Sequence, residues 1–309
     1  MEFLRILGCG SALPVGNRYP SAQIIKNKER YLLIDCGEGT QLRIREAKIS
    51  FNRITHIFIS HLHGDHFFGL PGLLSSFHLL GRTKELYLYG PKGLMEILEL
   101  QFKLSGTTLR YQIIFTEVKC SDKKLIMEDN SIEVYSFPLN HRIRCHGYFF
   151  QEKKKPASLL SEKIKEYSIP DFVRGKIKLG CDYVMDNGRV IPHSELTIPA
   201  PNPVSYAYCS DNRIKEKLKG LLQGVDYLYH ETTFMESEKD RAKKTYHSTA
   251  SEAGFLAKDL GVKQLIIGHY SARYQNLKPL LEECQEVFEN TVLGYEGFEL
   301  SFNYEGPSL

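Results

Sequence analysis

Short runs of β-branched and aromatic residues recur along the chain and predict β-strands. Between them lie segments with apolar residues at i, i+3 and i+4 spacing, which is typical of amphipathic helices. The predicted strands are AQIIKN (22–27), RYLLIDCG (30–37), HIFIS (56–60), ELYLYG (85–90), QIIFTEV (112–118), IEVYSF (132–137), HGYFF (146–150), SYAYCSD (205–211), DYLYHET (226–232), QLIIGHY (264–270) and FELSFNY (298–304). The predicted helices are GTQLRIREAK (39–48), LPGLLSSFHLL (70–80), GLMEILELQF (93–102), RIKEKLKGLL (213–222), ASEAGFLAKDL (250–260) and LKPLLEECQEVFEN (277–290). This mixture predicts an α/β fold in which helices cover the sheets.

Residues 151–203 interrupt this pattern, because they contain few apolar residues and several prolines. Between positions 153 and 178, eight lysines and arginines accompany three acidic residues, a local charge of +5 that exceeds the +3 of the whole chain. We interpret residues 151–203 as a basic arm inserted into a single domain that spans residues 1–309. Runs of charge usually mark a solvated face, and that alternative stays open here.

The composition is that of an ordered globular protein, with 42% hydrophobic and 25% charged residues. The net charge of +3 is too small to indicate a polyanionic partner by itself. Seven cysteines without C-x-x-C spacing indicate neither a disulfide framework nor a thiolate zinc site, so we expect a reducing, cytoplasmic compartment. The chain has no apolar run of about 18 residues and no secretory signal pattern, so we expect neither membrane spanning nor export.

The sequence ISHLHGDH (59–66) places three histidines and an aspartate where a predicted strand should end. The spacing of His61 and His63 can send both imidazoles to one side, while Asp65 and His66 can face a second point nearby. Crowding these groups would cost roughly a few kcal/mol each in desolvation unless something binds them. We therefore predict a metal site, whereas the isolated His56, His78 and His193 are interpreted as structural.

Three further polar residues lie at strand ends, each directly after an apolar run: His141 after VYSFPLN (134–140), Asp211 after SYAYCS (205–210) and His269 after QLIIG (264–268). Loops at the carboxyl ends of strands converge in α/β folds, so these side chains can join the cluster. Imidazole and carboxylate ligands without thiolate fit zinc best, with manganese or iron as alternatives. Two such ions can activate a water and stabilise an in-line displacement at phosphorus. The predicted arrangement is His61, His63 and His141 on one ion, Asp65, His66 and His269 on the other, and Asp211 bridging both.

These residues resemble the metallo-β-lactamase superfamily and, within it, the ribonuclease Z family. The resemblance spans nearly the whole chain and rests on LGCGSALPVGNRYPSA (7–22), LLIDCGEGTQLR (32–43), SHLHGDHFFGLPGLL (60–74), LNHRIRCHGY (139–148), HETTF (230–234), HSTA (247–250) and GHYSARY (268–274). It implies an αββα four-layer sandwich, two Zn²⁺ per subunit and a homodimer. It also implies cleavage of the 3′ trailer from precursor tRNA, which leaves a 3′-hydroxyl on the tRNA and a 5′-phosphate on the trailer.

Two segments depart from the family pattern. The arm of the family commonly carries a Gly-Pro-rich motif, whereas this chain reads SIPDFVRGK (168–176). The family's HEAT tetrad is His230-Glu231-Thr232-Thr233 here, which keeps the acid in place. We expect the catalytic chemistry to survive the second change, while the first leaves the geometry of the arm open.

Catalytic roles are expected for Asp65, His247 and Glu231. Asp65, as a carboxylate beside the ions, can accept a proton from the attacking water, although a role as ligand alone stays open. The resemblance favours His247 as the acid that protonates the leaving oxygen, oriented by Glu231. Asp35 is expected to accept a hydrogen bond from a ligating imidazole, with an extra ligand as the alternative.

Four basic residues are candidates for substrate binding. Arg273 can pair with a phosphate through its planar fork of donors, although a surface ion pair is an equal alternative. Lys153, Lys154 and Lys155 open the basic arm, which the resemblance identifies with the part that grips tRNA. A small-molecule hydrolase of the same fold, either a phosphodiesterase or a thioesterase, would need no such arm and stays as the alternative function.

Overall fold

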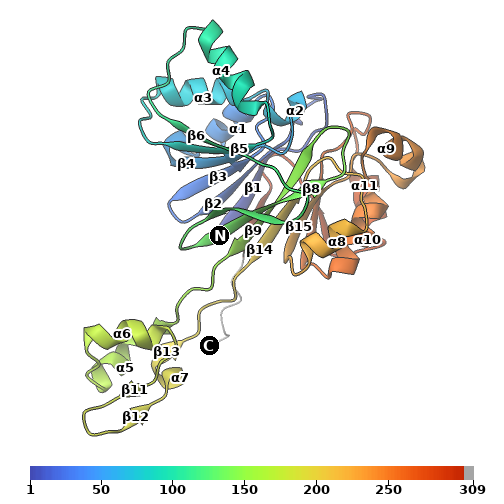
Figure 1. The fold of residues 1–309 in the computed structure, drawn as a ribbon. Coiled ribbons are helices and arrows are strands. Elements are labelled where there is room, and N and C mark those ends of the chain that lie inside the picture. The colour runs from blue at the N-terminus through green and yellow to red at the C-terminus, as the bar shows by residue number, and fades with distance from the viewer. Residues whose placement is uncertain (303–309) are drawn as a thin grey trace.

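The structure is a computed structural model that describes residues 1–302, and its main body contains two seven-stranded sheets that pack face to face (Figure 1). Helices cover the outer face of each sheet. The predicted α/β class and its αββα layering are therefore confirmed. The strand predicted at 298–304 is present as β18 (Glu299–Ser301), and positions 303 and 304 lie outside the described residues.

The first sheet has the strand order β18-β1-β2-β3-β4-β5-β6. Helices α1, α3 and α4 lie over its outer face (Figure 1). The strands are β1 (Phe3–Gly8), β2 (Ala22–Asn27), β3 (Arg30–Ile34), β4 (Ile54–Phe58), β5 (Leu86–Gly90) and β6 (Ile113–Glu117). The helices are α1 (Thr40–Glu46), α2 (Gly64–Phe67), α3 (Leu70–Leu79) and α4 (Leu94–Leu104), with a 3₁₀ turn η1 (Phe51–Arg53).

The second sheet has the order β17-β16-β15-β14-β9-β8-β7. Helices α8, α10 and α11 lie over its outer face (Figure 1). Its strands are β7 (Lys124–Glu128), β8 (Ile132–Leu139), β9 (Cys145–Glu152), β14 (Ser205–Cys209), β15 (Tyr227–Glu231), β16 (Gln264–Gly268) and β17 (Thr291–Leu293). Its helices are α8 (Lys217–Leu222), α9 (Lys239–Thr245), α10 (Ala250–Leu260) and α11 (Lys278–Gln285), with a 3₁₀ turn η2 (Glu236–Glu238).

The central strands are apolar on both faces, because each sheet is covered on both sides. In β3, Leu32 and Ile34 face the core between the sheets, while Leu33 packs under the helices of the first layer. The strands β3, β4, β5 and β6 run parallel, and so do β14, β15, β16 and β17. Parallel strands bring their carboxyl ends to one edge, which is where the predicted metal ligands follow them.

The arm leaves the second sheet between β9 and β14 and projects from the main body (Figure 1). It contains β10 (Ser158–Leu159), α5 (Ser161–Glu166), α6 (Asp171–Lys178), β11 (Tyr183–Val184), β12 (Val190–Ile191), α7 (His193–Leu196) and β13 (Thr197–Ile198). It has a small core of its own, formed by Ile169, Ile177, Ile191 and Leu196. The first two residues of the predicted arm, Gln151 and Glu152, belong to β9.

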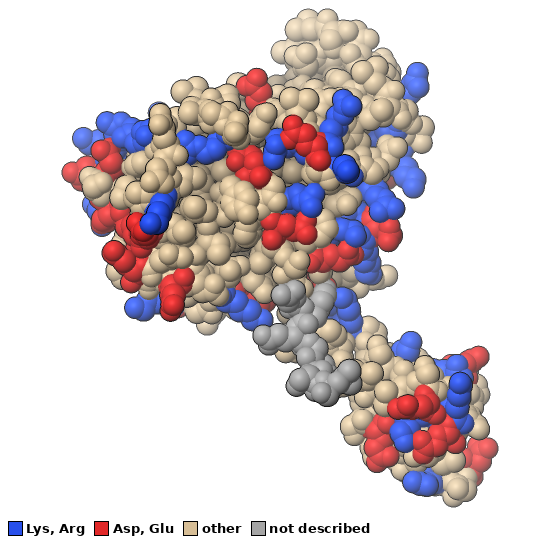
Figure 2. Space-filling view, turned by 180° about the vertical axis from the view of Figure 1, so that it is seen from behind, with Lys and Arg blue, Asp and Glu red and all other residues tan. Residues whose placement is uncertain are grey.

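The net positive charge of the whole arm is smaller than that of residues 153–178 alone. Residues 179–203 add one arginine against three acidic residues. Figure 2 shows acidic side chains gathered among the basic ones on the arm. The basic excess is therefore confined to residues 153–178, and three of its members, Lys153, Lys154 and Lys155, lie in the neck that joins the arm to β9.

No helix in residues 1–302 is long and apolar enough to cross a membrane.

Candidate metal centre

Seven side chains meet at the carboxyl ends of the central strands. His61, His63, Asp65 and His66 lie in the loop and short helix after β4, while His141 follows β8, Asp211 follows β14 and His269 follows β16. They form two groups in which the ligand atoms lie within 4.8 Å of one another. The groups are His61, His63, His141 and Asp211, and Asp65, His66 and His269. The structure thus brings together every predicted ligand.

Asp211 lies between the two groups and points one carboxylate oxygen at each. Its Oδ2 is 3.6 Å from Nε2 of both His61 and His141. Its Oδ1 is 3.3 Å from Nε2 of His66 and 3.1 Å from Nε2 of His269. This buried Oδ1 has no hydrogen-bond partner, so its nearest neighbours are not positioned as donors. A carboxylate in this position is suited to bridge two cations.

The ring nitrogens of the cluster also lie close to one another. Nδ1 of His63 lies 3.1 Å from Nε2 of His61 and 3.2 Å from Nε2 of His141, and Nε2 of His66 lies 3.3 Å from Nε2 of His269. Neutral imidazoles in contact through their lone pairs repel each other unless a cation lies between them. The residues therefore fit a bound divalent metal, for which neutral imidazole and carboxylate are ordinary ligands.

The electrostatics of the cluster agree with this assignment. Burial lowers the pKa of His61 and His63, and it lowers the pKa of His141 to about 4, so these three rings are neutral and able to ligate. Burial also opposes the charged form of His66, yet the carboxylates of Asp65, Asp211 and Asp35 raise its pKa well above the usual value. These carboxylates thus favour positive charge at the second group, which a bound metal cation would supply.

Asp35 supports the cluster from behind, where it contacts the far side of His66. Its Oδ2 lies 2.8 Å from Nδ1 of His66 and accepts hydrogen bonds from the hydroxyls of Tyr208 and Ser60. The contact fixes the tautomer of His66 so that Nε2 faces the cluster. Asp35 therefore orients the ring of His66, a predicted ligand, from the side that faces away from the other cluster residues.

Asp65 is held by a backbone donor from a distant loop. The N–H of Ala12 donates to Oδ2 of Asp65 at 2.8 Å, and Ala12 has a left-handed φ of 58°. The same oxygen lies 3.4 Å from Nε2 of both His66 and His269. Burial opposes ionisation, but the two histidines outweigh it and hold the pKa of Asp65 well below its usual range. Asp65 is therefore a carboxylate at neutral pH.

Glu231 and His247 form a hydrogen-bonded pair beside the cluster. Nδ1 of His247 lies 3.0 Å from Oε1 of Glu231, a fully buried carboxylate that also accepts the backbone N–H groups of Asn212 and Ser248. Burial opposes the charged form of His247, but Glu231 outweighs it and raises the pKa of His247 to about 9. Shortly after His247, Thr249 and Glu252 form a capping box at the start of α10.

Thr233 connects this pair to the metal cluster. Its hydroxyl donates to Oε2 of Glu231 at 2.6 Å and lies 2.9 Å from Nδ1 of His269. Since the carboxylate only accepts, the hydroxyl gives its proton to Glu231 and accepts from His269. This arrangement leaves Nε2 of His269 unprotonated and directed at Asp211. The hydroxyl and the N–H of Thr232, the third residue of the HEAT-like tetrad, both donate to the Gly268 carbonyl.

Replacing Thr233 with valine should lower metal affinity by roughly 10- to 100-fold, the usual cost of losing such an outer hydrogen bond. The reason is that His269 would lose the acceptor that sets its tautomer. Titration with a competing chelator measures this affinity. Thr233→Ser keeps the hydroxyl and should bind metal like the wild-type protein, and equal affinities of all three proteins would contradict the role.

The four predicted substrate-binding residues lie outside this cluster. Nη1 of Arg273 pairs with Glu238 at 3.0 Å, and its guanidinium lies over the ring of Phe234 at 5.2 Å. The ion-pair alternative for Arg273 is thus what the structure shows. Lys153 pairs with Glu128, Lys155 pairs with Glu152, and Lys154 lines a hollow in the neck of the arm.

The metal cluster opens into a pocket of about 540 Å³. Nine of the pocket residues were not predicted as site residues, and Leu13, Phe68 and Arg142 are among them. Arg142 directly follows His141, a predicted ligand, so its position in the sequence was a usable signal. The lining residues are Ser11, Ala12, Leu13, Pro14, Pro20, Glu38, His63, Gly64, Asp65, Phe68, His141, Arg142, Asp211 and His247.

Comparisons with known proteins agree with this geometry. Ribonuclease Z from Parabacteroides distasonis is 47% identical over 298 residues, and that from Bacteroides fragilis is 46% identical over 298 residues; each alignment covers 96% of this chain and 98% of the relative. The crystal structure of the short form of human tRNase Z is 25% identical with a TM-score of 0.70, covering 97% of this chain and 99% of that chain. Residues 2–158 match the family model described as Anti-Pycsar protein Apyc1. The chain belongs to the ribonuclease Z family, and through residues 2–158 also to the family that the Apyc1 model describes.

Proposed function

We propose that this protein is the endoribonuclease that cuts the 3′ trailer from precursor tRNA, leaving a 3′-hydroxyl on the tRNA and a 5′-phosphate on the trailer. The observation that carries the proposal is the pairing of a seven-ligand metal cluster with the Glu231–His247 pair in one pocket. An attacking water and a leaving oxygen need separate proton-transfer groups, and Asp65 and His247 supply one each.

Two zinc ions are the proposed cofactors, with manganese as the alternative. His61, His63 and His141 would hold one ion, Asp65, His66 and His269 the other, and Asp211 would bridge them. When bound, such ions supply a nucleophile at neutral pH and neutralise charge on the phosphate. The chain itself fixes the ligands through Asp35, Thr233 and the Ala12 amide.

Asp65 is the proposed base and His247 the proposed acid. The Ala12 amide occupies one lone pair of Asp65 Oδ2 and leaves the carboxylate able to accept a proton from the attacking water. Glu231 holds Nδ1 of His247, so Nε2 is the nitrogen available to protonate the oxygen that leaves from the tRNA 3′ end. The two groups therefore act on different oxygens of one in-line displacement.

Incubating the purified, metal-loaded protein with a precursor tRNA that carries a 3′ trailer tests the function. We expect one cut, with the end groups stated above. An intact precursor, alongside efficient turnover of a thioester or a cyclic phosphodiester, would favour the alternative of a small-molecule hydrolase. The proposed place of action is the cytoplasm, in keeping with seven free cysteines.

The arm of residues 151–203 is the proposed exosite for tRNA. Lys154 and Lys178 line one hollow of about 440 Å³ in its neck, together with His193. Folded RNA is bound mainly through its backbone and shape, and phosphate contacts favour lysines. Lys153 and Lys155 are proposed as further contacts, although each is also engaged in an ion pair within the protein.

Removing the arm should impair cleavage of precursor tRNA far more than hydrolysis of a small phosphodiester. The neck permits a clean excision, because Gln151 pairs with Ser205 and the Glu152 N–H donates to the Val204 carbonyl at 2.9 Å. Residues 154–202 can therefore be replaced by an Asn-Gly hairpin turn. We expect the salt dependence of tRNA cleavage to weaken as well, and equal losses on both substrates would mean that the arm is structural.

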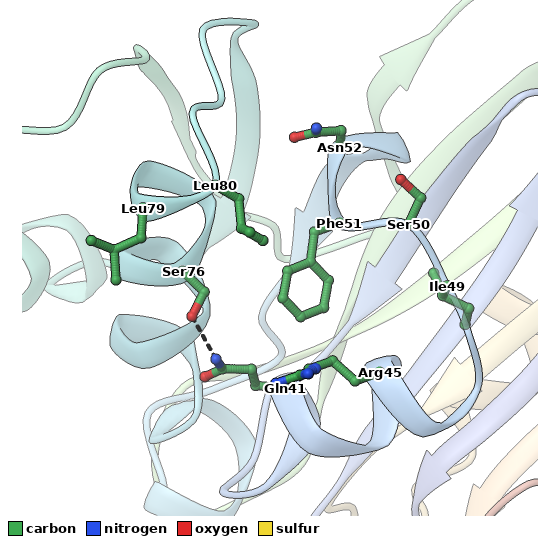
Figure 3. A pocket seen from close by; sticks show the side chains of 9 residues that line it. All are labelled: Gln41, Arg45, Ile49, Ser50, Phe51, Asn52, Ser76, Leu79 and Leu80. Atoms are coloured by element: carbon green, nitrogen blue, oxygen red, sulfur yellow. Dashed lines mark hydrogen bonds between the residues drawn. The ribbon is translucent and has the colours of Figure 1, made fainter.

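We propose that the protein is a homodimer whose interface includes the ends of α1 and α3. Leu42, Leu79 and Leu80 are 55%, 79% and 60% exposed there. Leu79 and Leu80 line a hollow of about 590 Å³ in which Leu80 lies opposite Phe51, and Gln41 of α1 bonds to Ser76 of α3 (Figure 3). This hollow holds none of the metal-cluster residues. An exposed apolar patch marks an interaction surface, and a two-fold dimer places the same patch of both subunits in contact. A second copy of this chain is therefore the proposed occupant.

Replacing Leu79 and Leu80 together with glutamate should convert the protein to a monomer of 35.5 kDa, because two carboxylates cannot be buried in an apolar contact. Sedimentation equilibrium measures the mass. Phe255→Glu, on the exposed side of α10, is the matched control and should remain dimeric. A wild-type protein that sediments as a monomer would contradict the dimer.

A further inference from the structure

Two apolar side chains stand exposed at the rim of the catalytic pocket. Phe68 is 66% exposed and Leu13 is 64% exposed, yet both line the pocket that contains His63, Asp65 and Asp211. Scattered exposed apolar residues need no explanation. These two are not scattered, because they come from segments 55 residues apart and meet at one opening. A rim of this kind points to a ligand with an apolar face.

The ring of Phe68 is held in place by its neighbours. A Cβ added to Gly64 would lie 2.2 Å from Cε2 and 2.6 Å from Cδ2 of Phe68, so the ring rests directly on the glycine backbone. The ring of Phe67 meets it edge-on, at 5.1 Å between centroids and 63° between planes. Gly69, the next residue, donates its N–H to the Cys36 carbonyl at 2.9 Å. Binding a flat ligand on this ring would therefore cost little side-chain entropy.

Leu13 is tied to the metal centre through the backbone of its loop. The preceding residue, Ala12, donates its N–H to Asp65, and the Leu13 N–H donates to the Ser11 carbonyl at 2.7 Å. Ser11 in turn donates to the Tyr270 carbonyl at 3.0 Å. Both apolar residues are therefore positioned by contacts to the loops that carry the metal ligands.

We propose that Phe68 is a stacking platform for the nucleobase next to the scissile phosphodiester, with Leu13 as a second apolar contact for that nucleotide. The inference rests on the proposed function, because it assumes an RNA substrate. Every nucleobase has a π-face, so a fixed aromatic ring can position a strand without reading its sequence. The pocket volume of about 540 Å³ lies in the range of ligand sites, roughly 300–1,000 Å³.

The test combines variants of Phe68 with precursor tRNAs that lack one base. Phe68→Ala should lower kcat/KM on the intact precursor by roughly 10-fold or more, the size expected for a lost base–aromatic stack. Phe68→Trp should retain activity, whereas Phe68→Leu, which is apolar but has no π-face, should lose as much as the alanine variant. Phe255→Ala removes another exposed ring, on α10, and is the matched control.

An abasic nucleotide is then placed on either side of the cut in turn. At one of the two positions it should slow the wild-type protein about as much as Phe68→Ala does, and the variant should show no further loss on that substrate. Metal content and thermal melting, measured for each variant, separate misfolding from lost binding. If the wild-type protein cuts the precursor, the proposed function stands. The stacking role is then wrong if the losses from Phe68→Ala and from the abasic nucleotide add at both positions. It is also wrong if the Phe68→Leu variant is as active as the Phe68→Trp variant. If the wild-type protein does not cut, the proposed function fails and this inference fails with it.

Discussion

Asp211→Ala should release bound divalent metal and abolish cleavage together, with a loss of activity of at least ~10³-fold. The reason is that Asp211 points one oxygen at each ligand group, and its buried Oδ1 has no hydrogen-bond partner among the described residues. Without it, the facing nitrogens of His66 and His269 lose the negative charge that helps to hold a cation between them.

Elemental analysis of the purified variant, alongside the cleavage assay, measures both effects. Asp259→Ala is the matched control, since Asp259 is an exposed aspartate that pairs only with Lys219 among the described residues, and it should retain full metal content. Retained occupancy of both sites in the Asp211 variant would refute the bridging role. Loss of activity with metal intact would assign Asp211 to another task.

His247→Ala should lower cleavage of precursor tRNA by ~10²- to 10⁴-fold while leaving the metal in place, the usual size of a lost general acid. The ring of His247 lies beside the rings of His141 and His269, and its Nδ1 bonds to Glu231. His247 belongs to neither of the two ligand sets proposed here. Glu231→Gln should cause a similar loss. The double variant should be no worse than either one alone, because the two residues act as a unit.

The choice of leaving group makes this prediction specific. A phosphodiester that expels p-nitrophenolate needs no proton on its leaving oxygen, so His247→Ala should hydrolyse it nearly as fast as the wild-type protein does. Equal losses on this substrate and on precursor tRNA would contradict a role as acid. A loss of metal in the variant would instead make His247 a ligand, as its proximity to Asp211 and His269 allows.

The sequence was most informative where a polar residue directly follows an apolar strand. His141, Asp211 and His269 are isolated in the chain, yet each ends a recognisable strand, and strand ends converge in a layered α/β fold. The mixture of short apolar strands and amphipathic helices was also enough to predict that helices cover the sheets. Within the two seven-stranded sheets, strands β1, β7 and β17 were not predicted. In β7, Leu125 is 40% exposed, and such an edge strand lacks the continuous apolar run of a central one.

Contacts that join distant loops could not be predicted in this way. The hydrogen bond from Ala12 to Asp65 depends on a left-handed backbone conformation at a residue that is not glycine. The partner of Arg273 is Glu238, 35 positions away, and nothing in the local pattern favours that pair over a phosphate. Likewise, the small core of the arm is formed by four apolar residues spread from Ile169 to Leu196. Each case is set by tertiary packing rather than by local pattern.

The most direct test of the metal centre is anomalous diffraction from crystals grown with zinc. We expect two peaks, one among His61, His63 and His141 and one among Asp65, His66 and His269, with the Asp211 carboxylate between them. A single peak, or imidazoles that point away from one another around empty density, would contradict the two-metal centre on which the proposed cleavage of RNA depends.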